Sequence, residues 1–188
     1  MTRRISGLAA AALVAVGLLA SCTPFVPGME TLKLQHDGRC RTYHLFLPSC
    51  AMSKPRPLVI ALHRFTERGP SMAYMSRFND LAAREGFMAA YPDAAGLAFN
   101  AFSGDGVDDV GFILALREEL IEQYGADGER VYLVGASNGG FMTHRIARTA
   151  PEAFAAAATV MATVPPATAA GCAPSAGIPV LLIHGLDD

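Results

Sequence analysis

The stretch VYLVGASNGGFM, residues 131–142, constrains the fold most, because it sets a serine between two glycines where two sequence patterns meet. Residues 131–134 form a short apolar run that is typical of a buried strand. Beyond the serine, apolar residues recur at helical spacing, at Phe141, Met142, Ile146 and Ala147. A strand that turns sharply at a serine and enters a helix is typical of a nucleophile elbow.

Ser137 is therefore the candidate nucleophile. Gly135 and Gly139 flank it, and neither flank of so tight a turn tolerates a bulky Cβ. The serine would stand at a helix N-terminus, where the backbone N–H of Asn138 can help to hold an oxyanion. The competing interpretation is a small residue in a Gly-rich turn, since the pattern G-x-S-x-G also arises by chance; the flanking segments favour the nucleophile.

Apolar strands alternate with helices along the chain, which predicts an α/β fold with a mostly parallel sheet covered on both faces. We expect one helix over 71–86, with Ser71 as its N-cap, and the turn ADGER (126–130) before the strand at 131. Asp108 and Asp109 are expected as first-turn acids of a second helix that stops at Gly125. Further strands are expected at 41–48, 57–63, 87–93, within 153–163 and at 179–185. Chemistry in such sheets sits at the carboxyl ends of the strands, where His63, Ser137 and residues 184–188 fall.

The N-terminus has the pattern of an export signal. MTRR is followed by 16 uncharged residues, ISGLAAAALVAVGLLA, a length typical of a signal-peptide core. The core ends in LASC, which resembles a bacterial lipobox and makes Cys22 the expected lipidation site; ordinary secretion is the alternative. We therefore expect a signal peptide at 1–21, a tether at 22–39 and a catalytic domain at 40–188, in a cell-envelope lipoprotein or an extracellular protein. A lipid anchor would be its contact with the membrane.

Composition and motifs argue against several classes of function. The formal charge is −2, with 15 basic and 17 acidic residues and no basic cluster, so no nucleic-acid partner is expected. Neither a phosphate-binding loop nor a metal-ligand spacing is present, so we expect no cofactor and no metal. Export permits disulfides, but Cys40 and Cys50 bracket an expected strand and would lie roughly 30 Å apart, too far to bridge. A bridge to Cys172, or to a cysteine of another chain, stays open.

Six segments in order, RTYHLFLP, PLVIALHRFTE, EGFMAAYPD, VDDVGFI, RVYLVGASNGGFM and PVLLIHGLDD, resemble the α/β-hydrolase superfamily. Residues 40–188 look most like its secreted polyhydroxybutyrate depolymerase and feruloyl esterase branch. The resemblance implies an α/β-hydrolase fold with Ser137 as nucleophile, Asp188 as the triad acid, and the N–H groups of Asn138 and Phe65 as oxyanion donors. It also implies a serine esterase that forms an acyl-enzyme and hydrolyses a polyester or the acyl or feruloyl esters of a polysaccharide.

Two features depart from that family pattern. Arg64 stands where the family usually has glycine, and a positive φ there would cost about 1–2 kcal/mol and shift the oxyanion donor. The triad of this fold runs serine, acid, histidine, so with Asp188 as the acid the histidine is expected beyond residue 188. We then expect an incomplete catalytic domain, inactive as it stands. A naturally inactive protein is the alternative.

None of the five histidines is expected to be the base. His63 and His184 are expected in structural roles, His144 lies two turns along the elbow helix and away from the ends of the strands, and His36 and His44 lie near the N-terminal edge. Two other functions stay open. A serine peptidase of the prolyl-oligopeptidase type shares the H-G-x-x-D turn, and a surface lipoprotein could bind ligands on a non-catalytic hydrolase scaffold. The oligomeric state cannot be read from the sequence.

Overall fold

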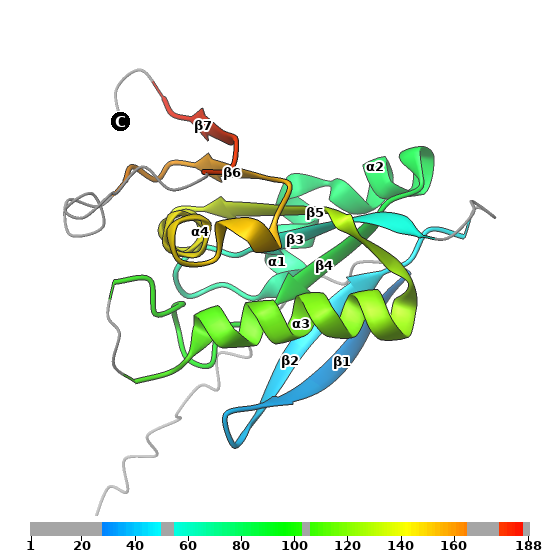
Figure 1. The fold of residues 1–188 in the computed structure, drawn as a ribbon, viewed down its shortest axis with the longest axis horizontal. Helices are drawn as coiled ribbons and strands as arrows, with labels where there is room; N and C mark the ends of the chain where they lie inside the picture. Colours follow the sequence, from blue (N-terminus) through cyan, green and yellow to red (C-terminus); the bar gives the residue numbers. More distant parts are fainter. Residues whose placement is uncertain (1–27, 50–54, 103–105, 165–176, 186–188) are drawn as a thin grey trace, which may run out of the picture.

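The computed structural model describes residues 28–49, 55–102, 106–164 and 177–185. Its strands form one seven-stranded sheet in the order β1-β2-β4-β3-β5-β6-β7 (Figure 1). Two pairs of neighbouring strands are antiparallel. Strand β1 (Met29–His36) pairs with β2 (Arg39–Phe46), and β2 also pairs with β4 (Met88–Pro92). The remaining pairs are parallel and involve β3 (Arg56–Leu62), β5 (Ala126–Ala136), β6 (Ala156–Val160) and β7 (Val180–Ile183).

Helices cover both faces of the sheet, as the apolar strands predicted. Residues alternate between the two faces of β3, so Leu58 and Ile60 point into one core and Ala61 into the other. The first core lies under α3 (Asp109–Tyr124) and α4 (Asn138–Thr149), and the second under α1 (Gly69–Ser76) and α2 (Phe78–Glu85). A short 3₁₀ turn, Pro151–Ala153, follows α4.

Three local expectations were wrong. Residues 29–36 were assigned to a tether but form β1, because their alternating burial lets them pair along the whole of β2. The helix expected over 71–86 is two helices, broken at Arg77, whose φ of 54° ends α1; α1 starts at Gly69 and Pro70, so Ser71 lies inside it. The segment 126–130 belongs to β5 and is not a separate turn. Its pairing with β3 is irregular there, because the register shifts between Arg56 and Leu58.

The long helix α3 begins and ends as predicted, but Asp108 is its N-cap rather than a first-turn acid, and Asp109 has a partner that was not expected. Asp108 caps the helix by accepting the Gly111 N–H at 2.8 Å, and Gly125 ends it at a φ of 74°. Asp109 was expected as a first-turn acid favoured by the helix dipole. It does lie in the first turn, and it is also buried and paired with Arg41 of β2, with a distance of 2.5 Å between Oδ1 and Nη2.

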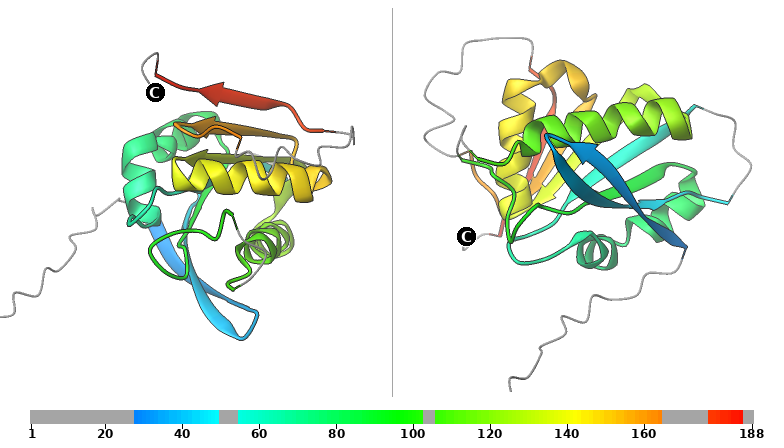
Figure 2. Two further views of the ribbon diagram at one scale, coloured as in Figure 1. Left: turned by 90° about the vertical axis from the view of Figure 1, so that its left-hand side faces the viewer. Right: turned by 90° about the horizontal axis from the view of Figure 1, so that it is seen from below.

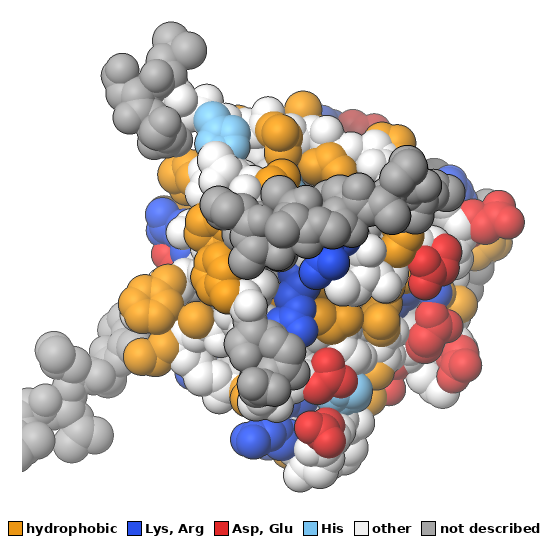
Figure 3. All heavy atoms as spheres, turned by 60° about the vertical axis from the view of Figure 1, so that its left-hand side comes forward, with side chains coloured by type: hydrophobic (Ala, Val, Ile, Leu, Met, Phe, Trp, Pro, Cys, Tyr) orange, Lys and Arg blue, Asp and Glu red, His pale blue; other side chains and the backbone are white. Residues whose placement is uncertain are grey.

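Strand β7 forms the outer edge of the sheet in the described part of the chain (Figure 2). All four residues of β7 are apolar and exposed, and the exposed fraction of Leu181 is 59%. On the face drawn in Figure 3, hydrophobic side chains reach the surface in several places between charged ones. Among the described helices, none is both long enough and apolar enough to span a bilayer.

Candidate active site

Ser137 stands where β5 passes into α4, near the middle of the sheet. Its φ of 50° and ψ of −115° lie in a region that residues with a side chain rarely adopt. The turn is held on one side by β6, because the Ser137 N–H donates to the Val160 carbonyl at 2.9 Å. The Phe141 N–H donates to the Ser137 carbonyl at 3.0 Å and starts the helix. The serine is thus presented at the carboxyl end of β5 by a constrained turn.

The two flanking glycines are required by close backbone approach. A Cβ on Gly135 would collide with the carbonyl oxygen of Gly139, and a Cβ on Gly139 would collide with the carbonyl oxygen of Leu62. The first turn of α4 therefore packs directly on the end of β3. This contact explains why both positions of the G-x-S-x-G pattern are glycine here.

The expected oxyanion donors lie on either side of that contact. Asn138 is the first residue of α4, and Phe65 lies in the loop that follows β3. Among the described residues, no hydrogen bond uses the Phe65 N–H or the Ser137 hydroxyl. The next amide along, that of Thr66, donates to the Leu97 carbonyl at 2.7 Å and fixes the loop.

Arg64 does not create the strain expected of it. The residue with positive φ in this loop is Thr66, at 64°, and Arg64 is not among the positive-φ residues. The Arg64 guanidinium forms an ion pair with Glu67, three residues on, so its side chain turns along the loop. The non-glycine residue is accommodated because the left-handed conformation falls two positions later.

The side chain of Asn138 has a role that the sequence analysis missed. Its Oδ1 accepts the Phe99 N–H at 2.8 Å, and its Nδ2 donates to the Phe99 carbonyl at 3.1 Å. Phe99 is buried, and its ring packs on His63 with 4.6 Å between the ring centroids. The partners are 39 residues apart, so no local pattern indicates the contact.

His63 has the structural role expected of it. It is fully buried; its Nδ1 lies 2.7 Å from the Arg64 carbonyl and its Nε2 3.0 Å from the Ala94 N. Since the Ala94 N–H can only donate, Nε2 is the unprotonated nitrogen and Nδ1–H donates to Arg64. Burial lowers the pKa of His63 below its usual value, which keeps the ring neutral and both bonds intact.

The other four histidines also have no hydrogen bond to Ser137. His36 lies 3.0 Å from Asp108 and His44 lies 3.0 Å from the Thr31 hydroxyl, both on the β1–β2 side of the sheet. His144 is buried in α4 near the Ala162 carbonyl, and His184 is exposed just after β7. Asp188 and Cys22 lie outside the described residues, as do Cys50 and Cys172; Cys40 is described and has an exposed thiol.

Three exposed apolar side chains, Phe65, Leu97 and Met161, form what we call the apolar rim, on loops at the end of the sheet where Ser137 lies; it was not foreseen from the sequence. Phe65 is 57% exposed and Leu97 61%, and their loops are joined by the Thr66–Leu97 hydrogen bond. Met161, 42% exposed, follows β6 directly after the residue that holds the Ser137 N–H. Exposed apolar groups on converging loops are typical of a surface that binds an apolar ligand.

Comparison with known proteins identifies the family. Residues 41–176 match the model of the family described as esterase PHB depolymerase. The chain belongs to this family. A feruloyl esterase B of Neurospora crassa is 33% identical over 123 residues, covering 61% of this chain and 41% of its own length. An acetylxylan esterase A of Aspergillus ficuum is 32% identical over 138 residues, which cover 69% of this chain and 43% of the relative's length. The chain thus spans less than half the length of these curated family relatives.

Solved structures share the fold of this chain. An acetyl xylan esterase from Aspergillus awamori aligns with a TM-score of 0.60 and 25% identity, over 70% of this chain and 50% of that one. A thermostable esterase aligns with a TM-score of 0.65 and 20% identity, over 86% of this chain and 47% of that one. The α/β-hydrolase fold expected from the sequence is confirmed.

Proposed function

We propose that this protein is a serine esterase that hydrolyses carboxylic esters through an acyl-enzyme formed on Ser137. The observation that carries the proposal is the conformation of that serine, held at a φ of 50° between β5 and α4 by hydrogen bonds to β6 and within the helix. Backbone strain of this kind persists only where the surrounding structure enforces it, and it is concentrated at functional sites. The family membership and the esterase relatives support the same chemistry.

In the proposed reaction the Ser137 hydroxyl attacks the ester carbonyl, and the N–H groups of Asn138 and Phe65 stabilise the resulting oxyanion. Expulsion of the alcohol leaves an ester on Ser137, which water then hydrolyses. The proton acceptor would be a histidine oriented by Asp188; among the described residues, no histidine forms a hydrogen bond to Ser137. The apolar rim of Phe65, Leu97 and Met161 would hold the acyl group.

We propose acyl esters on polysaccharide, acetyl or feruloyl, as the substrates, with a polyester of the hydroxybutyrate type as the alternative. The relatives' names support the first class, and the family description supports the second. The signal-peptide pattern at 1–21 and the lipobox-like cysteine at Cys22 support an exported protein that meets such substrates outside the cytoplasm.

The test combines covalent labelling with a substrate panel. The full-length protein and its Ser137→Ala variant are treated with a fluorophosphonate probe, and the labelled peptide is mapped by mass spectrometry. Hydrolysis is measured on p-nitrophenyl butyrate, acetylated xylan, feruloylated arabinoxylan and polyhydroxybutyrate. Labelling at Ser137 together with turnover that Ser137→Ala abolishes supports the proposal. Labelling of a different serine, or equal turnover by the variant, contradicts it. A peptide substrate in the panel tests the peptidase alternative.

A further inference from the structure

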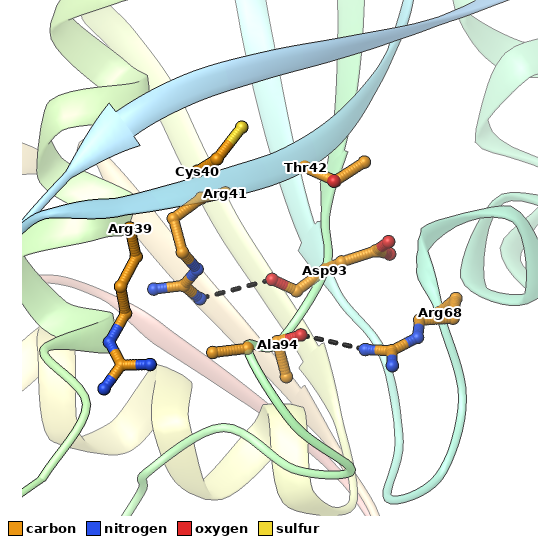
Figure 4. A pocket seen from close by; sticks show the side chains of 8 residues that line it. Arg39, Cys40, Arg41, Thr42, Arg68, Asp93 and Ala94 are labelled. Atoms are coloured by element: carbon orange, nitrogen blue, oxygen red, sulfur yellow. Dashed lines mark hydrogen bonds between the residues drawn. The ribbon is translucent and has the colours of Figure 1, made fainter.

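A second polar site lies on the β2–β4 side of the sheet. A cavity of about 330 Å³ opens between the start of β2 and the loop after β4, and its walls include Arg39, Arg41 and Arg68 (Figure 4). Ser137 does not line it. Its volume is at the lower end of the range for small-molecule sites. Three guanidinium groups around one cavity point to an anionic ligand.

Arg41 supplies a fixed donor with unused capacity. Its side chain is 2% exposed, and Nη2 donates to the Asp109 carboxylate at 2.5 Å and to the Asp93 carbonyl at 3.2 Å. The guanidinium carbon lies 3.9 Å from the centroid of the Phe112 ring, which holds its plane. Nη1 is buried and has no hydrogen-bond partner among the described residues. A buried N–H of a charged group is costly to leave unpaired, so Arg41, which borders the cavity, has donor capacity that no described residue uses.

Arg68 and Arg39 supply charge that no described carboxylate neutralises. Arg68 donates from Nη1 to the Ala94 and Gly96 carbonyls, both at 2.8 Å, and neither oxygen carries a full charge. Arg39 is exposed and forms no ion pair with a described residue.

The one acidic side chain in the walls faces elsewhere. The Asp93 carboxylate accepts the Gly69 N–H at 2.7 Å and lies 3.4 Å from His44 Nε2. Figure 4 shows it directed away from Arg39 and Arg41. The cavity therefore has an excess of positive charge.

We propose that this cavity binds an oxyanion, either a carboxylate or a phosphate group. Guanidinium groups present N–H donors in a planar fork that matches both anions. The anion could be an acidic group on the polymer that carries the ester, a source that rests on the proposed function, or a free anion from solution. The loop that lines the cavity at Asp93 and Ala94 continues to Phe99, the partner of Asn138, so it joins the cavity to the elbow.

The binding test does not depend on catalysis. Inorganic phosphate and glucuronate are titrated into the protein and followed by calorimetry, with Arg39→Gln as the test variant because Arg39 is exposed and holds no other residue. Arg84→Gln is the matched control, since Arg84 is an exposed arginine on α2 paired with Glu85. We expect saturable binding that Arg39→Gln weakens about tenfold and that Arg39→Lys partly restores, because each charge-assisted bond contributes strongly. Absence of saturable binding, or equal affinities for the wild type and Arg39→Gln, would overturn the proposal.

A kinetic arm distinguishes the two sources. KM is compared for acetylated oligosaccharides with and without a glucuronate side group, in the wild type and in Arg39→Gln. A rise in KM for the acidic substrate alone assigns the site to the substrate. Unchanged KM values beside weakened phosphate binding assign it to a free anion. Ser137→Ala should bind phosphate like the wild type, so a failure of the esterase proposal leaves the binding result readable.

Discussion

Asn138 binds the backbone of Phe99 with both ends of its side-chain amide, at 2.8 Å through Oδ1 and 3.1 Å through Nδ2. The residue that follows the candidate nucleophile thus fixes the loop after β4, while its own N–H is a proposed oxyanion donor. One side chain couples the position of this loop to the geometry of the elbow.

Asn138→Ala should therefore lose both stability and activity. It leaves the buried N–H of Phe99 unpaired, while the Phe99 carbonyl keeps the Ala101 N–H at 2.9 Å, and we expect a loss of about 1–3 kcal/mol of unfolding free energy. We expect kcat to fall as well, because the start of α4 is no longer fixed. Asn79→Ala is the control: Asn79 is also buried and accepts the Tyr91 hydroxyl at 2.6 Å, but it lies on α2. Urea unfolding and ester kinetics on both variants make the comparison, and equal kcat values would refute the coupling.

The strain at Ser137 can be measured by comparing two inactive variants. Ser137→Ala keeps a Cβ at a φ of 50°, whereas Ser137→Gly removes it. We expect the glycine variant to be more stable than the alanine variant by about 1 kcal/mol, since relief of strain exceeds the entropic cost of glycine. Thermal unfolding of the two proteins tests this. An alanine variant as stable as the glycine variant would mean that the turn is not strained.

Gly139→Ala should destabilise the protein through overpacking. The added Cβ would meet the Leu62 carbonyl, a backbone atom that cannot turn aside, and we expect a loss of about 1–3 kcal/mol despite the better helix propensity of alanine. Gly96→Ala is the matched control, because a Cβ there meets nothing within 4 Å. Similar midpoints of urea unfolding for the two variants would contradict the close contact between α4 and β3.

His63 should make stability depend on pH in the slightly acidic range. Burial lowers its pKa in the folded state, whereas in the unfolded chain it takes up a proton near pH 6.5. The unfolded state then binds more protons, so the unfolding free energy should fall as the pH is lowered below about 6.5. Protonation of Nε2 would also break the bond from the Ala94 N–H. Urea unfolding at pH 7.5 and 5.5 should show a larger loss for the wild type than for His63→Gln, and equal losses would exclude His63 as the cause.

The elbow and the order of strands and helices could be predicted because both are local in sequence. The run at 131–134, the glycines around Ser137 and the Gly125 stop each act within a few residues. The missed features depend on distant partners. Asp109 is the first-turn acid that the sequence indicated, but its pairing with Arg41, 68 residues away, has no local signal. Strand β1 was missed because it is stabilised by pairing with β2. The break at Arg77 left no signal either, because arginine is a good helix former and nothing local requires its left-handed conformation.

The strand order also bears on when the candidate site can form during folding. The β1–β2 hairpin closes over two residues, but β3 must pair with β5, with more than sixty residues between their paired positions. Closing so long a loop is entropically costly and slow. The turn at Ser137 is held by β6 and packs on the end of β3, so its conformation has support only after these distant strands have paired. In a partly folded chain the turn at Ser137 would lack this support, so the proposed nucleophile would take up its constrained conformation only with the assembled sheet.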